Sequence, residues 1–309
     1  MPAVYIRAMA IEIRIEKPEH FVLATAVCGH GWYDLLPFRW NADLGSLGYV
    51  FRSANGKQVT HGTIAEHGNA IVVKLENSKV QRDKVERDVR HILRMDDDMT
   101  EFYSVAEGSH GTRWVASRGA GRLLRSAAVF EDIVKTMCTT NCSWGLTRKM
   151  VENLVEKLGE RAGMNAKAFP TADAMASVDE DFYRNEIKAG YRSPYFVELA
   201  TRVRDGEIDP ESFLHSDLPT AELKKEIKNI KGFGDYAADN LLKLLGRYDG
   251  LALDSWVRAK YIAKHNKGKV CPDKTITKHY SKFGKWQGLM IWCDMTEDWF
   301  ANNNDGSAR

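Results

Sequence analysis

Residues 222–242 read ELKKEIKNIKGFGDYAADNLL, and this stretch decides the fold. It contains two segments with helical periodicity that are joined by Gly232, Phe233 and Gly234. Two glycines let the backbone turn sharply and approach another molecule closely, because no Cβ stands in the way. The helix that follows presents free N–H groups and the positive end of its dipole, an arrangement that suits a phosphate. The stretch therefore predicts either a plain corner between two helices or a phosphate-binding hairpin.

Basic residues near the turn favour phosphate binding. Four lysines lie beside it in the sequence: Lys224, Lys225, Lys228 and Lys231. Residues 255–285 then hold nine Lys and Arg residues against Asp273 alone, a local charge of +8, although the whole chain has 44 basic and 42 acidic residues. Counterion release makes the binding of a polyanion to such a region strongly salt-dependent. The alternative interpretation, a solvated helical face, stays open.

An aspartate closes the short apolar run at residues 251–253 and precedes the next helical segment. Asp is among the best N-cap residues, so Asp254 is expected to cap that helix. A carboxylate at the mouth of a pocket also has a chemical use, because it stabilises developing positive charge or activates water. The two roles are compatible at one position.

The chain divides into a β-rich part and a helical part. Ile11, Ile13 and Ile15 alternate with charged residues, which is the period of a half-buried strand. Further strands are predicted at 22–27, 49–52, 59–66 and 70–75, with a charged helix at 79–94 and a solvated acidic loop at 96–98. Helices are predicted after Ser126, which can cap the first of them, and at 147–158, 179–189, 195–205, 218–230, 236–245, 255–264 and 275–290. We therefore predict an α+β fold, with an antiparallel β-sheet domain at 1–118, a helical domain at 119–301 and a disordered tail at 302–309.

Length and composition limit the class of protein. With 309 residues and 44% hydrophobic side chains, the chain has enough apolar material for a large core. We find no run of 18 or so apolar residues that could span a bilayer. The five cysteines are scattered and odd in number, which is typical of reduced thiols. We expect a soluble, cytoplasmic monomer with no membrane partner.

The chain resembles the helix-hairpin-helix (HhH-GPD) DNA glycosylase superfamily. The hairpin at residues 230–238, followed by Leu253 and Asp254, is similar to the signature of that superfamily. Segments 29–32, 35–40, 121–125 and 130–141 are similar to the β domain and first helices of the 8-oxoguanine and alkyladenine glycosylases. The resemblance covers residues 8–300 and implies double-stranded DNA as the partner.

The resemblance implies roles for individual residues. Asp254 matches the catalytic carboxylate, and Gly232, Phe233 and Gly234, with Lys231, match the hairpin that grips the DNA backbone. Tyr236 stands where bifunctional members carry a nucleophilic lysine, so no Schiff base can form there. The resemblance also implies a place in the base pocket for Tyr236, because the alkyladenine enzyme has an aromatic residue at this position.

Three further positions are matched on the DNA-binding side. Asn141 resembles an asparagine that fills the space left by the flipped base, and Tyr191, followed by Arg192, resembles a residue that wedges into the stack. Leu146 stands where an arginine reads the opposite cytosine in the 8-oxoguanine enzyme. Cys271 and Cys293 cannot supply the spacing of an iron-sulfur cluster, so neither a metal nor another cofactor is expected.

These observations predict a monofunctional DNA glycosylase that flips a damaged or modified base out of the duplex and hydrolyses its N-glycosidic bond. An alkylated purine is the first guess for the base, because an aromatic wall favours cationic bases. Hypermodified phage bases and oxidised guanine are alternatives, as is lyase activity through another lysine. An alternative of another class is a non-catalytic hairpin module that binds DNA and uses Asp254 only as a cap.

Overall fold

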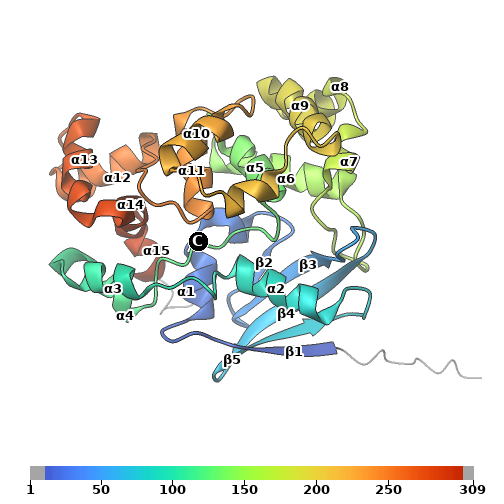
Figure 1. Cartoon of the computed structure of the whole chain (residues 1–309), viewed down its shortest axis with the longest axis horizontal. Helices are drawn as coiled ribbons and strands as arrows, with labels where there is room; N and C mark the ends of the chain where they lie inside the picture. Colours follow the sequence, from blue (N-terminus) through green and yellow to red (C-terminus); the bar gives the residue numbers. More distant parts are fainter. Residues whose placement is uncertain (1–10, 302–309) are drawn as a thin grey trace, which may run out of the picture.

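The structure is a computed structural model that describes residues 11–301. Figure 1 shows a β-sheet on one side of the molecule and the helices of the second half of the chain packed over it. The predicted tail at 302–309 lies outside the described residues. No helix among the described residues is long and apolar enough to cross a membrane.

The five strands form one antiparallel sheet with the order β1-β5-β4-β3-β2. They are β1 (Ile11–Glu16), β2 (Arg39–Asn41), β3 (Ser46–Arg52), β4 (Val59–His67) and β5 (Ala70–Leu75). In β1 the alternation of the sequence is preserved, since Ile13 and Ile15 are buried while Glu12 and Arg14 are exposed. The strands predicted at 11–16, 49–52, 59–66 and 70–75 are confirmed.

The strand predicted at 22–27 is wrong, because helix α1 (Leu23–Cys28) occupies this segment. Leu23, Ala26 and Val27 lie at i, i+3 and i+4, so a helical turn buries all three on one side. A strand would turn Ala26 and Val27 to opposite faces of the sheet. Six residues are too few for the sequence to distinguish these two patterns.

The rest of the chain is mainly helical, which confirms the predicted sequence of a sheet followed by a helical part. The helices are α2 (Arg82–Ile92), α3 (Thr100–Glu107), α4 (Arg113–Ser117), α5 (Val129–Thr139), α6 (Trp144–Leu158), α7 (Ala172–Ala176), α8 (Glu180–Phe182), α9 (Ser193–Arg204), α10 (Thr220–Lys228), α11 (Asp235–Leu244), α12 (Ser255–His265), α13 (Asp273–Tyr280), α14 (Gln287–Met295) and α15 (Glu297–Ala301). Short 3₁₀ or π segments connect several of them: η1 (Gly31–Asp34), η2 (His110–Thr112), η3 (Tyr183–Ile187), η4 (Gly190–Arg192), η5 (Pro210–His215) and η6 (Ser281–Trp286).

Two helix predictions need correction. Ser126 does not cap α5, because Ala128 is the N-cap residue and the free N–H group of Val129 donates to Glu211 at 2.8 Å from a distant segment. The single helix predicted at 275–290 is interrupted by η6, since Gly284 has non-helical torsion angles (φ 54°, ψ −128°).

The predicted acidic loop at 96–98 is solvated only in part, because Asp97 pairs with the buried side chain of Arg94 at 2.6 Å.

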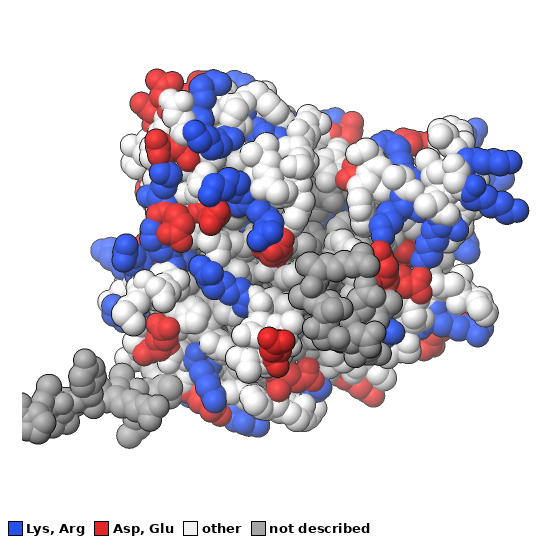
Figure 2. Space-filling view, turned by 180° about the vertical axis from the view of Figure 1, so that it is seen from behind, with Lys and Arg blue, Asp and Glu red and all other residues white. Residues whose placement is uncertain are grey.

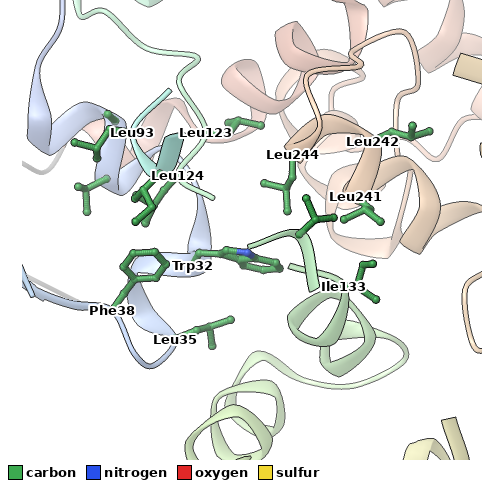
Figure 3. Close-up of a cluster of buried hydrophobic side chains, with 14 of the residues drawn as sticks. Trp32, Leu35, Phe38, Leu93, Leu123, Leu124, Ile133, Leu241, Leu242 and Leu244 are labelled. Carbon is green, nitrogen blue, oxygen red and sulfur yellow. The ribbon is translucent and has the colours of Figure 1, made fainter. Parts of the chain in front are cut away.

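One hydrophobic core runs from the sheet into the helices. Figure 3 shows Trp32 and Phe38 of the first part beside Ile133 of α5 and the leucines of α11. A buried ion pair between Lys135 and Glu131 of α5 (2.6 Å) extends this contact, because Tyr49 of β3 donates to Glu131 at 3.1 Å. The boundary at residue 118/119 stays a prediction, and the core crosses it without a break.

Two buried arginines fix the end of α11. The Arg94 guanidinium is 1% exposed and donates to the carbonyls of Leu123 (3.0 Å), Lys243 (2.9 Å) and Leu244. Arg125 donates to the Leu244 carbonyl at 3.2 Å, and burial, together with the charge of Arg94, lowers its pKa to about 10. The last carbonyls of a helix lack partners within the helix and carry its negative dipole end. The arginines supply both hydrogen bonds and positive charge there.

Candidate active site

The predicted hairpin forms between α10 and α11. Gly232 has φ +89°, and a Cβ at this position would lie 2.6 Å from the ring of Tyr195, so glycine is required. Gly234 is the N-cap residue of α11, and a Cβ there would meet no atom within 4 Å. The Phe233 side chain is buried beneath the turn. The fold therefore needs Gly232, whereas Gly234 leaves open space for a second molecule.

The lysines of the hairpin have acidic partners within the chain. Lys224 contacts Asp239 at 2.7 Å, and Lys228 contacts Asp235 at 3.0 Å. Lys231, the predicted DNA contact, lies 3.1 Å from Glu198 and is more than half exposed. A phosphate that approaches Gly234 would compete with these carboxylates for the ammonium groups. Positive charge at the turn is thus smaller than the lysine count predicted.

Asp254 is the N-cap of α12, as predicted. Its Oδ1 accepts a hydrogen bond from the Val257 N–H at 2.7 Å, and the residue is only partly buried. Two residues earlier, Ala252 has φ +51°, a left-handed conformation that is uncommon for alanine. Such backbone strain persists where the surrounding fold over-determines the conformation. The carboxylate is therefore held in place by its helix cap and by a constrained approach of the chain.

Tyr236 lies next to Asp254, so the structure brings the predicted catalytic and base-pocket residues together. Burial, followed by the charge of Asp254, raises the pKa of the Tyr236 hydroxyl well above its usual value. The side chains of Asp254 and of Thr139, at the end of α5, both lie close enough to this hydroxyl to affect its pKa. The phenol consequently stays protonated over the whole physiological range, and it positions the Asp254 carboxylate.

Asn141, on the loop between α5 and α6, and Tyr191 of η4 also come together. Asn141 has φ +47°, and its side-chain amide donates to the Tyr191 hydroxyl at 3.4 Å. Tyr191 packs edge to face against Tyr195, whose ring covers Gly232. Asp254, Tyr236, the Asn141 loop and the hairpin are thereby joined through direct neighbours. The predicted site residues form one continuous region.

Arg192 was predicted to contact DNA at the surface, but its side chain is buried. Its side chain is 3% exposed, and its guanidinium donates to the Oγ1 of Thr140 at 3.1 Å and to the Thr140 carbonyl. It therefore supports the backbone beside Asn141, and its burial keeps it away from a phosphate at the surface. Three large apolar side chains near Asn141 are exposed as well, since Trp144, Leu146 and Tyr191 are 40%, 38% and 47% exposed. Apolar side chains of this size are suited to insertion between base steps.

A hollow of about 360 Å³ lies between the start of α11 and the segment that leads to Asp254. Its lining includes Tyr236, Leu253 and three carboxylates, those of Asp235, Asp239 and Asp249. Negative charge repels phosphate, so this hollow does not suit the DNA backbone. The open space at Gly234 is the better approach for a phosphate.

Lys243, which sequence analysis missed, is the most unusual group near Asp254. Its side chain is 3% exposed, and its Nζ lies 4.8 Å from the ring centroid of Trp292. Within residues 11–301, no oxygen accepts a hydrogen bond from this Nζ. Burial lowers the pKa of the amine to about 8, although the charges of Asp254 and Asp239 act in the opposite direction. The signal in the sequence is a lysine within the apolar run at 241–245, seven residues after Tyr236.

Lys243→Met is expected to stabilise the protein at pH 7. The depressed pKa means that the unfolded chain binds more protons between pH 8 and pH 10.5, so burial of the charge destabilises the fold most below pH 8. A shift of this size corresponds to at most about 3 kcal/mol, less the contribution of the contact with Trp292. Urea unfolding at pH 7 and pH 10 should show the gain shrinking as the pH rises.

Lys260→Met is the matched control for this measurement. Lys260 also lies over a tryptophan, at 5.6 Å from the Trp256 ring centroid, but its side chain is 35% exposed and pairs with Asp298. Its loss should change stability by less than about 1 kcal/mol. A Lys243→Met protein that is less stable than the parent by the same amount at both pH values would contradict the buried charge.

The basic run at 255–285 is partly neutralised in the fold. Arg258 pairs with Asp273 (2.8 Å), Lys264 with Asp294 (2.7 Å), and Lys285 with Glu101 (2.5 Å). Figure 2 nevertheless shows Lys and Arg side chains gathered at the right edge of the molecule, the end that α12 and α13 form at the left of Figure 1. This edge is a candidate surface for a polyanion, and its effective charge is below the +8 of the sequence.

Three possible metal ligands meet near this edge, from His265, His279 and Asp294, and their donor atoms all lie within 4.8 Å of one another. The Asp294 carboxylate already contacts Lys264 (2.7 Å), His265 (2.7 Å) and the hydroxyl of Tyr280. Although burial opposes ionisation, these three hydrogen bonds lower the pKa of Asp294 to about 2. The Lys264 ammonium thus already neutralises the carboxylate that a metal ion would need as a ligand. The cluster is better described as an ion-pair network.

Comparison with protein-family models and with curated proteins found no match. Solved structures do match. The 3-methyladenine DNA glycosylase from Archaeoglobus fulgidus aligns with a TM-score of 0.75 and 19% identity, over 94% of this chain and 99% of that chain. MBOgg1, solved with a low-affinity DNA ligand, aligns with a TM-score of 0.74 and 18% identity, over 93% and 96%. The 8-oxoguanine glycosylase/lyase of Clostridium acetobutylicum was solved with DNA containing cytosine opposite 8-oxoguanine. It aligns with a TM-score of 0.66 and 19% identity, over 90% of this chain and 93% of that chain. The resemblance found in the sequence is thus confirmed at the level of structure, and the chain has the fold of the helix-hairpin-helix DNA glycosylases.

Proposed function

We propose that this protein is a monofunctional DNA glycosylase that acts on duplex DNA as a monomer. The observation that carries the proposal is the position of Asp254, which caps α12, contacts Tyr236 and belongs to the same continuous region as the hairpin. The fold supports it, because the similar solved structures are DNA glycosylases. Two of them are 8-oxoguanine-type enzymes and one acts on 3-methyladenine, so the fold alone leaves the base open.

In this mechanism Asp254 acts on the sugar of a flipped nucleotide. As the glycosidic bond breaks, positive charge develops on the sugar ring, and a fixed carboxylate stabilises that charge without reorganisation. The same carboxylate orients or deprotonates the attacking water. Flipping itself costs a few kcal/mol, least for weakened pairs, which contributes to selectivity. Asn141 and the exposed Tyr191 and Leu146 are suited to fill the gap in the duplex.

The absence of an amine at position 236 supports hydrolysis without strand cleavage. A protonated phenol cannot form a Schiff base with the opened sugar. Lys243 is the amine that an alternative lyase reaction would use, and it is buried behind Tyr236 on α11. The aromatic ring of Tyr236 supports an alkylated purine as the first guess, with oxidised guanine and hypermodified phage bases as alternatives.

A panel of duplexes tests the proposal. Each duplex carries 3-methyladenine, 7-methylguanine, 8-oxoguanine, uracil or glucosylated hydroxymethylcytosine, and heat or alkali then cuts any abasic site. Base release from at least one duplex, with strand cleavage only after heat or alkali, is the expected result. Cleavage without treatment, trapped by borohydride, would instead establish lyase chemistry. Binding to all duplexes without release from any would favour the non-catalytic hairpin module.

Gly234→Val is expected to weaken binding to every duplex by about tenfold, because a side chain would fill the space through which a phosphate reaches the start of α11. The fold should be unaffected, since a Cβ at Gly234 meets no atom within 4 Å. Anisotropy titrations at several salt concentrations measure this, and the affinity of the parent should fall steeply with salt. Gly111→Val, at another glycine with open surroundings, is the control. Equal loss in both variants, or affinity that does not depend on salt, would count against the hairpin as the grip.

A further inference from the structure

Lys243 and His30 are two buried polar groups that meet the same tryptophan. The Lys243 Nζ lies over the Trp292 ring, and the His30 ring lies 5.4 Å from that ring, centroid to centroid. His30 is 8% exposed, and its Nδ1 has no hydrogen-bond partner among the described residues. The Trp292 indole is fixed, because its Nε1–H donates to the Gly29 carbonyl at 2.8 Å. A buried imidazole nitrogen without a partner costs free energy unless a ligand satisfies it, and the neighbouring Lys243 ammonium can donate hydrogen bonds to the same ligand.

These groups lie where a flipped base would reach. Lys243 is seven residues after Tyr236, so it lies on the same face of α11, about 10 Å further along the axis. Long side chains of a helix lean toward its N-terminus, and this direction carries the Nζ back toward Tyr236 and Asp254. Asp254 acts on the charge of Lys243, and Lys243 is the charge that acts most on His30. A base whose sugar lies at Asp254 therefore points its far edge toward these two groups.

We propose that Lys243 and His30, held against Trp292, form the recognition end of the base pocket and select an uncharged base whose edge offers a carbonyl oxygen beside an N–H. The inference rests on the proposed glycosylase function. Lys243 donates to the carbonyl oxygen, because an ammonium has donors and no acceptor. The neutral Nδ1 of His30 accepts from the N–H.

The protonation states of the surrounding groups fit these roles. Burial, followed by the charge of Lys243, lowers the pKa of His30 to about 3, so the imidazole is neutral and one nitrogen is free to accept. Burial raises the pKa of the Cys293 thiol, which stays protonated. Asp239 and Asp254 are the acids that act on Lys243. Near neutral pH the Lys243 ammonium is the positive charge that acts most on His30, and Arg94 and Lys135 are the other positive charges that act on it.

The same arrangement disfavours cationic bases. A base with a fixed positive charge would seek the face of Trp292, which Lys243 already occupies, and it would meet a like charge in a buried setting. Among the alkylated purines proposed as substrates, the cationic ones, such as 7-methylguanine, are disfavoured at this end of the pocket. A neutral and a cationic purine of nearly equal size are therefore distinguished by their charge.

The test is equilibrium binding, which needs no turnover. Two duplexes carry non-hydrolysable 2′-fluoroarabino nucleotides, one with 8-oxoguanine, which is neutral and has the required edge, and one with cationic 7-methylguanine. At pH 6.5 the parent should bind the neutral duplex at least about tenfold more tightly, and Lys243→Met should reduce that preference to about threefold or less. His30→Phe, which keeps an aromatic ring, should weaken the neutral duplex alone.

Lys260→Met, at the exposed lysine over Trp256, should leave the preference unchanged, and thermal unfolding confirms that each variant is folded. The inference would be overturned if the parent and Lys243→Met preferred the neutral duplex equally, or if the parent preferred the cationic duplex. Base release by the parent would in that case still support the proposed function. A borohydride-trapped complex that disappears in Lys243→Met would overturn it in favour of a nucleophilic lysine. No preference for either duplex over undamaged DNA, together with no base release, would refute both proposals.

Discussion

Asp254→Asn is expected to lower base release by about a thousandfold or more while folding and DNA binding change little. Asparagine is as good an N-cap as aspartate, so its side-chain oxygen can still accept the N–H of Val257 and α12 keeps its first turn. The amide has no charge, however, and it can neither stabilise an oxocarbenium-like sugar nor take a proton from water. Single-turnover release from the best duplex of the panel measures the loss.

Asp179→Asn is the matched control. Asp179 caps α8 in the same manner, since its Oδ1 accepts the Phe182 N–H at 2.8 Å. This variant should retain the activity of the parent, which separates loss of a carboxylate at Asp254 from loss of any capping aspartate. If Asp254→Asn turns over as fast as the parent, Asp254 is only a cap, and the non-catalytic hairpin module becomes the better description.

Arg94→Met is expected to cause the largest loss of stability, about 3–5 kcal/mol. The substitution removes the donors to the carbonyls of Lys243 and Leu244 at the end of α11. It also leaves Asp97 without the guanidinium that, against the effect of burial, lowers the pKa of its carboxyl. Buried groups that lose one partner bear the full cost of desolvation. Urea unfolding at pH 7 gives the free energy directly.

Arg90→Met serves as the comparison, because Arg90 lies on α2 close to Arg94 in sequence but is 30% exposed. Its ion pairs with Glu86 (3.4 Å) and Asp96 (3.0 Å) are at the surface, where such pairs contribute about 1 kcal/mol or less. A loss of similar size in both variants would mean that the buried guanidinium has no special role at the end of α11.

The parts of the fold that the sequence predicted are those determined by local patterns. The alternation in β1 and the apolar spacing of α5 specify which side is buried, and Gly232 and Gly234 mark the turn of the hairpin. Asp254 was predictable because a good cap at the end of an apolar run is recognisable without any tertiary contact. The six residues of α1 were ambiguous, since a short apolar run fits both periods.

The parts that could not be predicted depend on contacts between distant segments. Glu211 replaces Ser126 at the start of α5 from 82 residues away, and no local pattern announces this. Arg192 was predicted as a DNA contact because it follows Tyr191 in a segment that resembles a DNA-inserting one, whereas Thr140 accepts its hydrogen bonds in the interior. Lys243 and His30 acquire their importance only when α11, α14 and the segment before η1 meet at Trp292.

The two arginines at the end of α11 also bear on the order in which the protein folds. Arg94 and the Lys243 carbonyl are 149 residues apart, so their contact forms only after a long loop has closed. During synthesis the segment with Arg94 and Arg125 leaves the ribosome well before α11, and the two arginines lack their acceptors on α11 until that helix arrives. A separately expressed fragment that starts at residue 119 would lack Arg94 altogether, and only Arg125 would remain as a donor to the Leu244 carbonyl in the last turn of α11. The two halves of the chain are thus expected to reach their native state in one cooperative step, with the site helix among the last elements to be secured.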